Sequence, residues 1–471
     1  MKNLVFVSGH FNVIHTGHIR LLRFAKECGD KLIVAVESDR IAKNAAYVPE
    51  LLRLEGVQTN SIVDEAFLID ESIEDVIARI QPSIVVKGKE HESKFNPELK
   101  ALEEYGGKLI FSSGETFFTS ADVFQKEFSS TTKLFNLPED YMKRHEIQKE
   151  RLLDLIDNFK KIKACVLGDL IVDEYISCQP LGMSQEDPTI VVKPIDSKKF
   201  IGGAGIVAAH GAGLGANIDF LSVAGNDLIH NFALHKLNDF NVNSNILYDE
   251  NRPTTLKQRY RSKGKSLLRV SHLHQEAIDA NLQIKFLETL EQKIQQYNLL
   301  IFSDFNYGCL PQNLVDSIIK LAKQNNIMMV ADSQSSSQIG DISRFLGMDL
   351  ITPTEREARI STRNKEDGLV ILADQLMKIS QSKNILLKLG EDGLLIHTGQ
   401  NTWTTDRIDA LNPIPKDVAG AGDSMLIASA LTMVAGGNIW ESALIGAIAA
   451  GIQVSRVGNI PLTSEEIIKE I

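Results

Sequence analysis

Short apolar runs rich in β-branched residues alternate with amphipathic stretches along most of the chain. This alternation is typical of the strands and crossover helices of a parallel α/β sheet. Residues 17–28 predict a helix, and the runs that predict strands lie at 4–8, 32–36, 84–86, 164–167, 299–303, 328–331, 350–352 and 385–389. We therefore expect an α/β fold in both halves of the chain.

The chain is too long for one hydrophobic core. Its 471 residues exceed the size at which a single domain keeps growing, so two or three domains are expected. The alternation stops between about residues 128 and 160, where a polar stretch ends in charged residues with helical spacing. We expect an N-terminal domain at 1–127, a helical linker at 128–160 and a domain at 161–471. The two domains should differ in fold, because the sequence has no internal repeat.

The charge and the cysteines argue against several function classes. A net charge of −11 opposes nucleic-acid binding, because the average field of such a surface repels a polyanion. The four cysteines lack CxxC and zinc-ligand spacing, which indicates free thiols. The N-terminus is unlike a signal peptide, and no apolar run approaches the ~20 residues that span a bilayer. We expect a cytoplasmic protein with neither a membrane nor a nucleic-acid partner.

A candidate phosphate site lies where the first predicted strand meets the first predicted helix. Ligands of open α/β sheets bind at that edge. Gly9 lets the backbone approach a phosphate, and the helix N-terminus at Gly17 attracts an anion. His15 and His18 are three residues apart, so both can face one side and stabilise charge on an α-phosphate under attack. The alternative is that both histidines are ordinary loop or capping residues.

Residues 9–18 fit the motif G-x-F-[DN]-x-x-H-x-G-H. The segment resembles the cytidylyltransferase-like nucleotidyltransferases, and the resemblance extends over about residues 1–125. It implies a Rossmann-like fold in which His15 and His18 are catalytic and Gly9, His10, Phe11 and Gly17 bind the nucleotide. It also implies that Lys87, in a segment similar to K-G-x-[DE]-[HYW], clamps a phosphate, and that Thr119 and Ser120 bind the nucleotide phosphates. Taken alone, Lys87 would be a solvated lysine.

A second candidate phosphate site is the turn Gly420-Ala421-Gly422-Asp423, which precedes a helical run. Successive N–H groups of such a turn can hold the charge that builds on a transferring phosphoryl group. Asp423 can accept the proton of an attacking hydroxyl. The alternative is a glycine-rich helix entry with Asp423 as its N-cap.

The turn resembles the D-[TV]-[TS]-G-A-G-D signature of the ribokinase-like (PfkB) sugar kinases, and the similarity covers about residues 160–465. It implies a ribokinase-like α/β domain that uses ATP and Mg²⁺, with Asp423 as catalytic base and Gly420, Ala421 and Gly422 at the nucleotide. Glu357 would act on the magnesium side through water. The substrate-binding residues implied by matching motifs are Asp169, Asp173, Gly202, Gly203 and Asp304.

Within this family, the stretches 182–188, 255–259 and 268–269 resemble the bifunctional heptose 7-phosphate kinases/heptose 1-phosphate nucleotidyltransferases, which make a lipopolysaccharide precursor. This resemblance implies that Lys257, Arg259 and Arg269 bind the phosphate of a sugar phosphate. Each could instead be a solvated surface charge. The resemblance also implies nucleotidyl transfer from ATP, with CTP as the alternative donor, and ribokinase-like domains are often homodimers.

The chain departs from that pattern. The two halves stand in the reverse order, and five kinase-motif positions differ, namely Ile206, Tyr307, Thr354, Ala419 and Ala447. Replacing an amide and an ammonium by isoleucine and tyrosine leaves polar groups of the usual substrate unpaired, at ~1–3 kcal/mol each. The leading hypothesis is a bifunctional enzyme of nucleotide-sugar synthesis. The alternative is a CTP-dependent nucleotidyltransferase for another phosphorylated sugar or polyol, with a regulatory kinase-like domain. A nucleotide-sensing scaffold without activity is the third reading.

Overall fold

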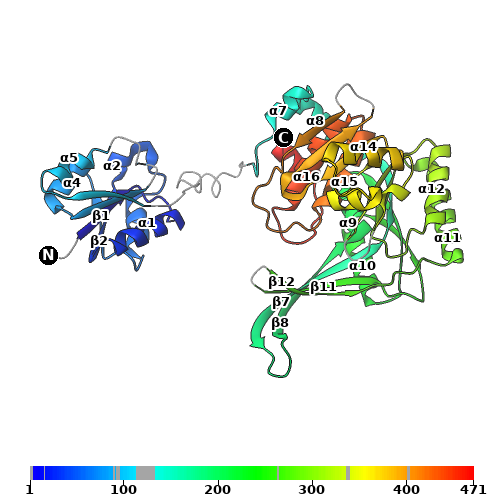
Figure 1. Ribbon diagram of the computed structural model, residues 1–471, viewed down its shortest axis with the longest axis horizontal. Coiled ribbons are helices and arrows are strands. Elements are labelled where there is room, and N and C mark those ends of the chain that lie inside the picture. Colours follow the sequence, from blue (N-terminus) through cyan, green and yellow to red (C-terminus); the bar gives the residue numbers. More distant parts are fainter. Residues whose placement is uncertain are drawn as a thin grey trace. The chain divides into compact units, whose positions relative to one another are not determined.

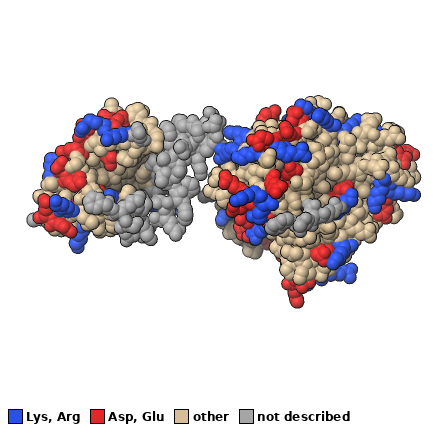
Figure 2. Space-filling model, turned by 90° about the horizontal axis from the view of Figure 1, so that it is seen from above, with Lys and Arg blue, Asp and Glu red and all other residues tan. Residues whose placement is uncertain are grey.

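The computed structural model describes residues 4–14, 16–88, 91, 96–112, 133–262, 265–335, 340–399 and 404–471. The chain divides into two compact units, Met1–Thr132 and Lys133–Ile471. On the face shown in Figure 2, Lys and Arg lie interspersed with Asp and Glu on both units. Among the residues described, no helix has the length and apolar character needed to cross a membrane.

The described part of the first unit is a five-stranded sheet in the order β3-β2-β1-β4-β5, with helices on its faces (Figure 1). All its strand pairs are parallel. The strands are β1 (Leu4–Gly9), β2 (Lys31–Glu37), β3 (Glu65–Ile69), β4 (Ile84–Gly88) and β5 (Lys108–Ser112). The helices are α1 (Thr16–Glu27), α2 (Asp39–Ala42), α3 (Glu50–Gln58), α4 (Ile73–Ile80) and α5 (Glu98–Glu103), with a 3₁₀ turn at Lys43–Ala45. The strands expected at 4–8, 32–36 and 84–86 and the helix at 17–28 are confirmed.

Alternating side chains of β1 bury both faces of this sheet. Val5 and Val7 belong to one apolar cluster with Leu22 of α1, whereas Phe6 packs with Val76 of α4 in another. Because both faces are covered, the carboxyl edge of the strands is where loops and ligands can meet.

The second unit contains, in its described residues, a nine-stranded sheet in the order β10-β9-β6-β13-β14-β15-β16-β17-β18. The strands are β6 (Lys163–Gly168), β9 (Asn217–Ala224), β10 (Asn243–Tyr248), β13 (Leu299–Asp304), β14 (Met328–Ser333), β15 (Leu350–Ile351), β16 (Asn384–Lys388), β17 (Leu394–Thr398) and β18 (Thr405–Ile408). The sheet is parallel up to β16, as the alternation predicted. The last two pairs are antiparallel, because β16, β17 and β18 are joined by short turns rather than by helices.

Helices cover both faces of this sheet. Successive residues of β13 alternate between the two large cores, with Leu299 and Ile301 in one and Leu300 and Phe302 in the other. The helices are α9 (Gly203–Gly213), α10 (Leu228–Asp239), α11 (Ala280–Glu291), α12 (Gln312–Gln324), α13 (Glu355–Thr362), α14 (Leu369–Ser380), α15 (Ala421–Val434), α16 (Ile439–Gln453) and α17 (Ser464–Glu470).

A separate four-stranded sheet in the order β12-β11-β7-β8 projects from this unit (Figure 1). Its strands are β7 (Leu170–Met183), β8 (Ile190–Gly202), β11 (Thr255–Ser262) and β12 (Lys265–His272). β7 leaves the larger sheet directly after β6, so the first residues of β7 lie close to the carboxyl edge of that sheet.

The segment expected as a helical linker forms α7 (Glu139–Arg144) and α8 (Lys149–Asp157). Both helices belong to the second compact unit and bury Tyr141, Leu152 and Leu155 in its core, whereas Leu153 is 37% exposed. The second unit therefore begins near residue 133, ahead of the expected start at 161.

Candidate functional site

The first candidate site is the loop that joins β1 to α1. Phe11 has a left-handed backbone with φ 49° and is buried, a conformation rare for a side chain of this size. Nδ1 of His10 lies 3.1 Å from Oε2 of Glu37 on the neighbouring strand β2. This contact with His10 is the largest cause that lowers the pKa of Glu37. The loop is therefore held against the sheet edge by contacts on both sides.

Arg53 of α3 ties this loop to the rest of the unit. Its guanidinium is 0% exposed and donates to the carbonyl oxygens of His10 (2.7 Å), Glu37 (2.8 Å) and Val48 (2.7 Å). It also pairs with Asp39 at 2.6 Å. Arg53 thus helps to position His10, a role that follows from this geometry.

His18 lies in the first turns of α1. Its Nδ1 is 3.0 Å from the carbonyl oxygen of Val13, and its ring centre is 5.1 Å from that of Phe11. Because a carbonyl only accepts hydrogen bonds, this contact assigns a proton to Nδ1.

Lys87 lies at the carboxyl end of β4, which pairs directly with β1. Its Nζ is 2.7 Å from Oε1 of Glu98, whose side chain is 4% exposed. The edge thus brings together Gly9, His10, Phe11, Gly17, His18 and Lys87. The other expected residues of this site, His15, Thr119 and Ser120, lie outside the described residues.

The second candidate site is the N-terminus of α15. Gly420 has φ 79° and is the N-cap, and a side chain there would collide with Asn459. Asp423 lies in the first helical turn, so the alternative in which Asp423 caps the helix is wrong. The backbone N–H groups that begin α15 remain directed at an incoming anion.

Asp423 has the electrostatics of a general base. It is buried, and its Oδ1 accepts a hydrogen bond from Nε2 of Gln334 at 2.9 Å. Burial, followed by the nearby Asp332 carboxylate, raises the pKa of Asp423 to about 7, against the opposing charge of Lys388. A base with a pKa near neutrality balances its ionised fraction against its affinity for the proton.

A row of cations on β11 faces a buried acid on β7. Lys257 and Arg259 alternate with Gln258, so both lie on one face of the strand. Nη2 of Arg259 is 3.4 Å from Oδ1 of Asp173. Asp173 and Lys257 both influence the pKa of Asp423, which places these groups close to the base.

Arg261 extends the same row. It was not among the site residues expected from the sequence, although residues 257, 259 and 261 are spaced two apart and therefore share one face of a strand. Its guanidinium lies 4.8 Å from the centre of the Tyr175 ring and 3.8 Å from Oδ2 of Asp417. Arg269, by contrast, is exposed on β12, opposite Arg259.

The two glycines of the expected sugar site begin α9. Gly202 is the N-cap of the helix, and a side chain there would collide with the Asp173 carboxylate. Gly203 has φ 59°, and a side chain there would meet the carbonyl oxygen of Asp169. These positions hold the helix close to β7 and Asp173.

Asp169 and Asp304 stabilise the backbone and side chains next to the site through hydrogen bonds. Asp169 accepts hydrogen bonds from the backbone N–H groups of Phe305 (2.8 Å), Tyr307 (3.4 Å) and Cys309 (3.2 Å). Burial, then the charge of Asp304, raises the pKa of Asp169 to about 6. Asp304 binds Arg344 at 2.8 Å. Both carboxylates therefore have protein partners and fix the loop at 305–309.

Three departures from the kinase pattern lie in or against apolar clusters, and a fourth, Thr354, caps a helix. Ile206 is 0% exposed in the apolar core, and the partly buried Ala447 packs against the same core. Tyr307 is 1% exposed beneath Lys257, and its buried hydroxyl has no hydrogen-bond partner.

Thr354 and Glu357 form a capping box at the start of α13. Oε2 of Glu357 accepts from the N–H of Thr354 at 2.7 Å, and Oε1 accepts from the N–H of Ser335 at 2.8 Å. Both carboxylate oxygens are thus engaged, and the described residues contain no group of three His, Cys, Asp or Glu that could hold a metal ion. The donor set fits a magnesium ion held mainly by substrate phosphates and water, with Glu357 in contact through water.

Two family profiles match the chain. Residues 161–466 match the pfkB family of carbohydrate kinases, and residues 6–135 match the cytidylyltransferase-like family. The bifunctional protein HldE of Sulfurimonas denitrificans is 29% identical over 309 residues, 64% of this chain and 62% of that protein. HldE of Desulfatibacillum aliphaticivorans is 28% identical over 314 residues, 66% and 63% respectively. The chain spans less than two thirds of the length of these curated relatives.

Solved structures show the same fold in the second unit. Phosphofructokinase-2 from Escherichia coli superposes with a TM-score of 0.54 at 16% identity, over 65% of this chain and 97% of that one. Arabidopsis thaliana ribokinase complexed with ribose and ATP gives 0.51 at 19% identity, over 66% and 98%. The ribokinase-like fold and both resemblances read from the motifs are confirmed.

Proposed function

Since the chain belongs to the pfkB family of carbohydrate kinases, we propose that its second unit transfers the γ-phosphoryl group of ATP to a hydroxyl of a sugar phosphate. The observation that carries this proposal is the buried Asp423, with a pKa of about 7, next to the N–H groups that begin α15. The cation row of Lys257, Arg259 and Arg261 supplies the charge for a phosphate already present on the sugar, such as a heptose 7-phosphate.

The proposed mechanism uses these groups in sequence. Asp173 and the row on β11 orient the sugar phosphate, and Asp423 removes the proton of the attacking hydroxyl. The N–H groups at Gly420, Ala421 and Gly422 stabilise the charge on the transferring phosphoryl group. A divalent metal ion, held by the nucleotide phosphates and by Glu357 through water, would neutralise part of that charge.

We propose that the first unit transfers a nucleotidyl group from ATP or CTP to a sugar 1-phosphate and releases pyrophosphate. Support comes from His18, whose Nδ1 contact with Val13 orients the ring, and from Lys87 at the adjacent strand end. The name of the HldE relatives supports the pairing of two activities. The product would serve as a precursor for lipopolysaccharide or another surface glycan. We assign this activity to the first compact unit, the kinase to the second compact unit, Lys133–Ile471, and both to a cytoplasmic homodimer.

Tyr307 favours a second candidate function. Its buried aromatic ring occupies a position where the kinases that this unit resembles have a lysine. In this alternative, the kinase-like unit binds a ligand without catalysis and regulates a CTP-dependent transferase for another phosphorylated sugar or polyol.

Both functions are tested on the purified full chain. Incubation with ATP and a panel of sugar phosphates should form ADP, and Asp423→Asn should abolish ADP formation. Incubation with ATP or CTP and sugar 1-phosphates should release pyrophosphate. A wild-type chain that forms no ADP but releases pyrophosphate supports the regulatory alternative, and a chain inactive in both assays contradicts both functions.

A further inference from the structure

Lys388 is the last residue of β16, and its side chain reaches the phosphate-binding turn at the start of α15. A side chain built at Gly422 would lie 3.2 Å from Nζ of Lys388. The ammonium group therefore lies directly against the second glycine of that turn. Neither the sequence motifs nor the departures from them pointed to this lysine.

Among the described residues, the ammonium group of Lys388 pairs with Asp332, which is deeply buried. Nζ lies 2.9 and 3.1 Å from the two carboxylate oxygens of Asp332, which is 1% exposed. The nearby carboxylates of Asp332, Glu357 and Asp423 raise the pKa of Lys388 against the effect of burial. Lys388 is therefore a positive charge among three acids, one of which, Asp423, is the proposed base.

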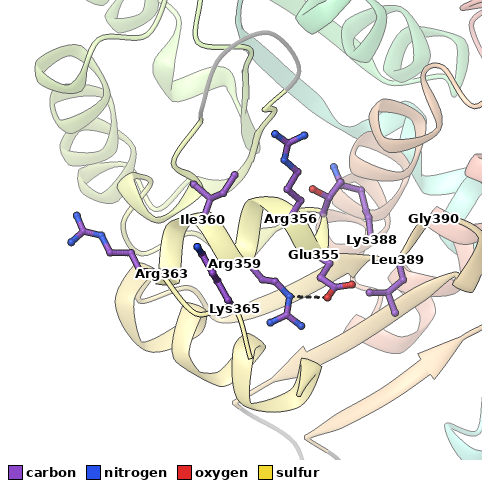
Figure 3. A pocket seen from close by; sticks show the side chains of 10 residues that line it. Glu355, Arg356, Arg359, Ile360, Arg363, Lys365, Lys388, Leu389 and Gly390 are labelled. Carbon is purple, nitrogen blue, oxygen red and sulfur yellow. Dashed lines mark hydrogen bonds and ion pairs between the residues drawn. The ribbon is translucent and has the colours of Figure 1, made fainter. Parts of the chain in front are cut away.

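A cavity of about 670 Å³ leads to this lysine. Besides Lys388, its lining includes Arg356, Arg359, Arg363 and Lys365 from α13 and the segment after it (Figure 3). Of the lining cations, Arg359 pairs with the lining acid Glu355 at 2.8 Å. The cavity thus has a cationic wall and a buried ammonium at the phosphoryl-transfer turn, which suits a polyanion such as the phosphate tail of a nucleotide.

We propose that Lys388 binds the β- and γ-phosphate oxygens of the donor nucleotide and is a further catalytic residue of the kinase, an inference that rests on the proposed function. In the reaction, the sugar oxygen bonds to the γ-phosphorus, the bond from that phosphorus to the β–γ bridging oxygen breaks, and ADP leaves. The hydroxyl proton passes to Asp423. Lys388 keeps its proton and changes partner from Asp332 to the phosphate oxygens, so its charge follows the transferring group.

The test compares Lys388→Met and Lys388→Arg with Lys383→Met, which removes an exposed lysine paired with Asp349 outside the cavity. Calorimetry on the full chain should show ATP binding at least tenfold weaker in Lys388→Met, with AMP binding within twofold of the wild type. Turnover should fall at least 100-fold, recover partly in Lys388→Arg, and stay unchanged in Lys383→Met.

If Lys388→Met does not fold, the double variant Lys388→Met, Asp332→Asn replaces it in the same measurements, because it leaves no unpaired buried charge. A folded variant whose ATP binding and turnover stay within threefold of the wild type overturns the role of Lys388. If the wild type binds ATP but never phosphorylates a sugar phosphate, the proposed kinase fails, while the ATP affinities still decide whether Lys388 binds phosphate. A wild type that does not bind ATP overturns both.

Discussion

The ammonium group of Lys257 lies 4.9 Å from the centre of the Tyr307 ring. A cation over an aromatic face gains ~0.5–2 kcal/mol. Tyr307→Leu removes this face and leaves the Phe305 ring, whose centre is 5.2 Å from the ammonium group, so Lys257 should be held less firmly. We expect KM for the sugar phosphate to rise about 2- to 30-fold, as measured by steady-state kinetics with saturating ATP.

The matched control is Tyr307→Phe, which keeps the ring and removes only the hydroxyl. That hydroxyl is buried and has no hydrogen-bond partner, so its removal should leave KM unchanged and the free energy of unfolding unchanged or higher. A Phe variant that loses as much affinity as the Leu variant would show that the hydroxyl, not the ring, is used.

The kinase rate should depend on the ionisation of Asp423. Because burial raises its pKa to about 7, most Asp423 side chains are protonated at pH 6 and cannot act as a base. We expect kcat to rise with pH, with a midpoint near 7, and to level off about one to two pH units above that midpoint. Gln334→Met removes a hydrogen bond to the ionised carboxylate, so the midpoint should shift upward. An unshifted midpoint would assign the titration to another group.

The same raised pKa predicts a stability effect. The unfolded chain has an ordinary aspartate pKa near 3.9, so between about pH 4 and pH 7 the folded state binds more protons and its free energy of unfolding falls as the pH rises. Asp423→Asn removes this loss. Chemical denaturation at pH 8 should find the variant more stable than the wild type, whereas at pH 4 the two should be similar. A variant less stable at both pH values would contradict the assignment.

The positions of the strand ends could be predicted from the sequence, but the side-chain partners of the residues at those ends could not. Asp169 and Asp304 follow buried strands, and both do lie at one sheet edge, because parallel strands share their carboxyl side. The sequence could not show that these acids bind the loop at 305–309 and Arg344 instead of a ligand. Lys388 and Asp332 are 56 positions apart, and no local pattern links residues that meet only through the order of strands in the sheet.

Thr354 should contribute to stability through the start of α13. Its side chain accepts the N–H of Glu357 in the capping box that starts α13. Thr354→Ala should lower the free energy of unfolding by about 1 kcal/mol. Thr354→Asn keeps an N-cap oxygen and should stay near the wild type in denaturant titrations. Equal destabilisation by Ala and Asn would mean that the methyl group of Thr354 provides the stability.

The two activities should be separable by one substitution in each unit. His18 belongs to the first compact unit and Asp423 to the second, and each unit has apolar cores of its own. His18→Ala removes a group expected to stabilise charge on the α-phosphate, so pyrophosphate release should fall about 100- to 1000-fold while ATP consumption with a sugar phosphate stays at the wild-type rate. Asp423→Asn should have the reverse effect. His235→Ala, which removes an exposed histidine of α10, controls for the loss of an imidazole and should change neither rate. If His18→Ala lowers both rates equally, the units are coupled and the assignment of one activity to each is wrong.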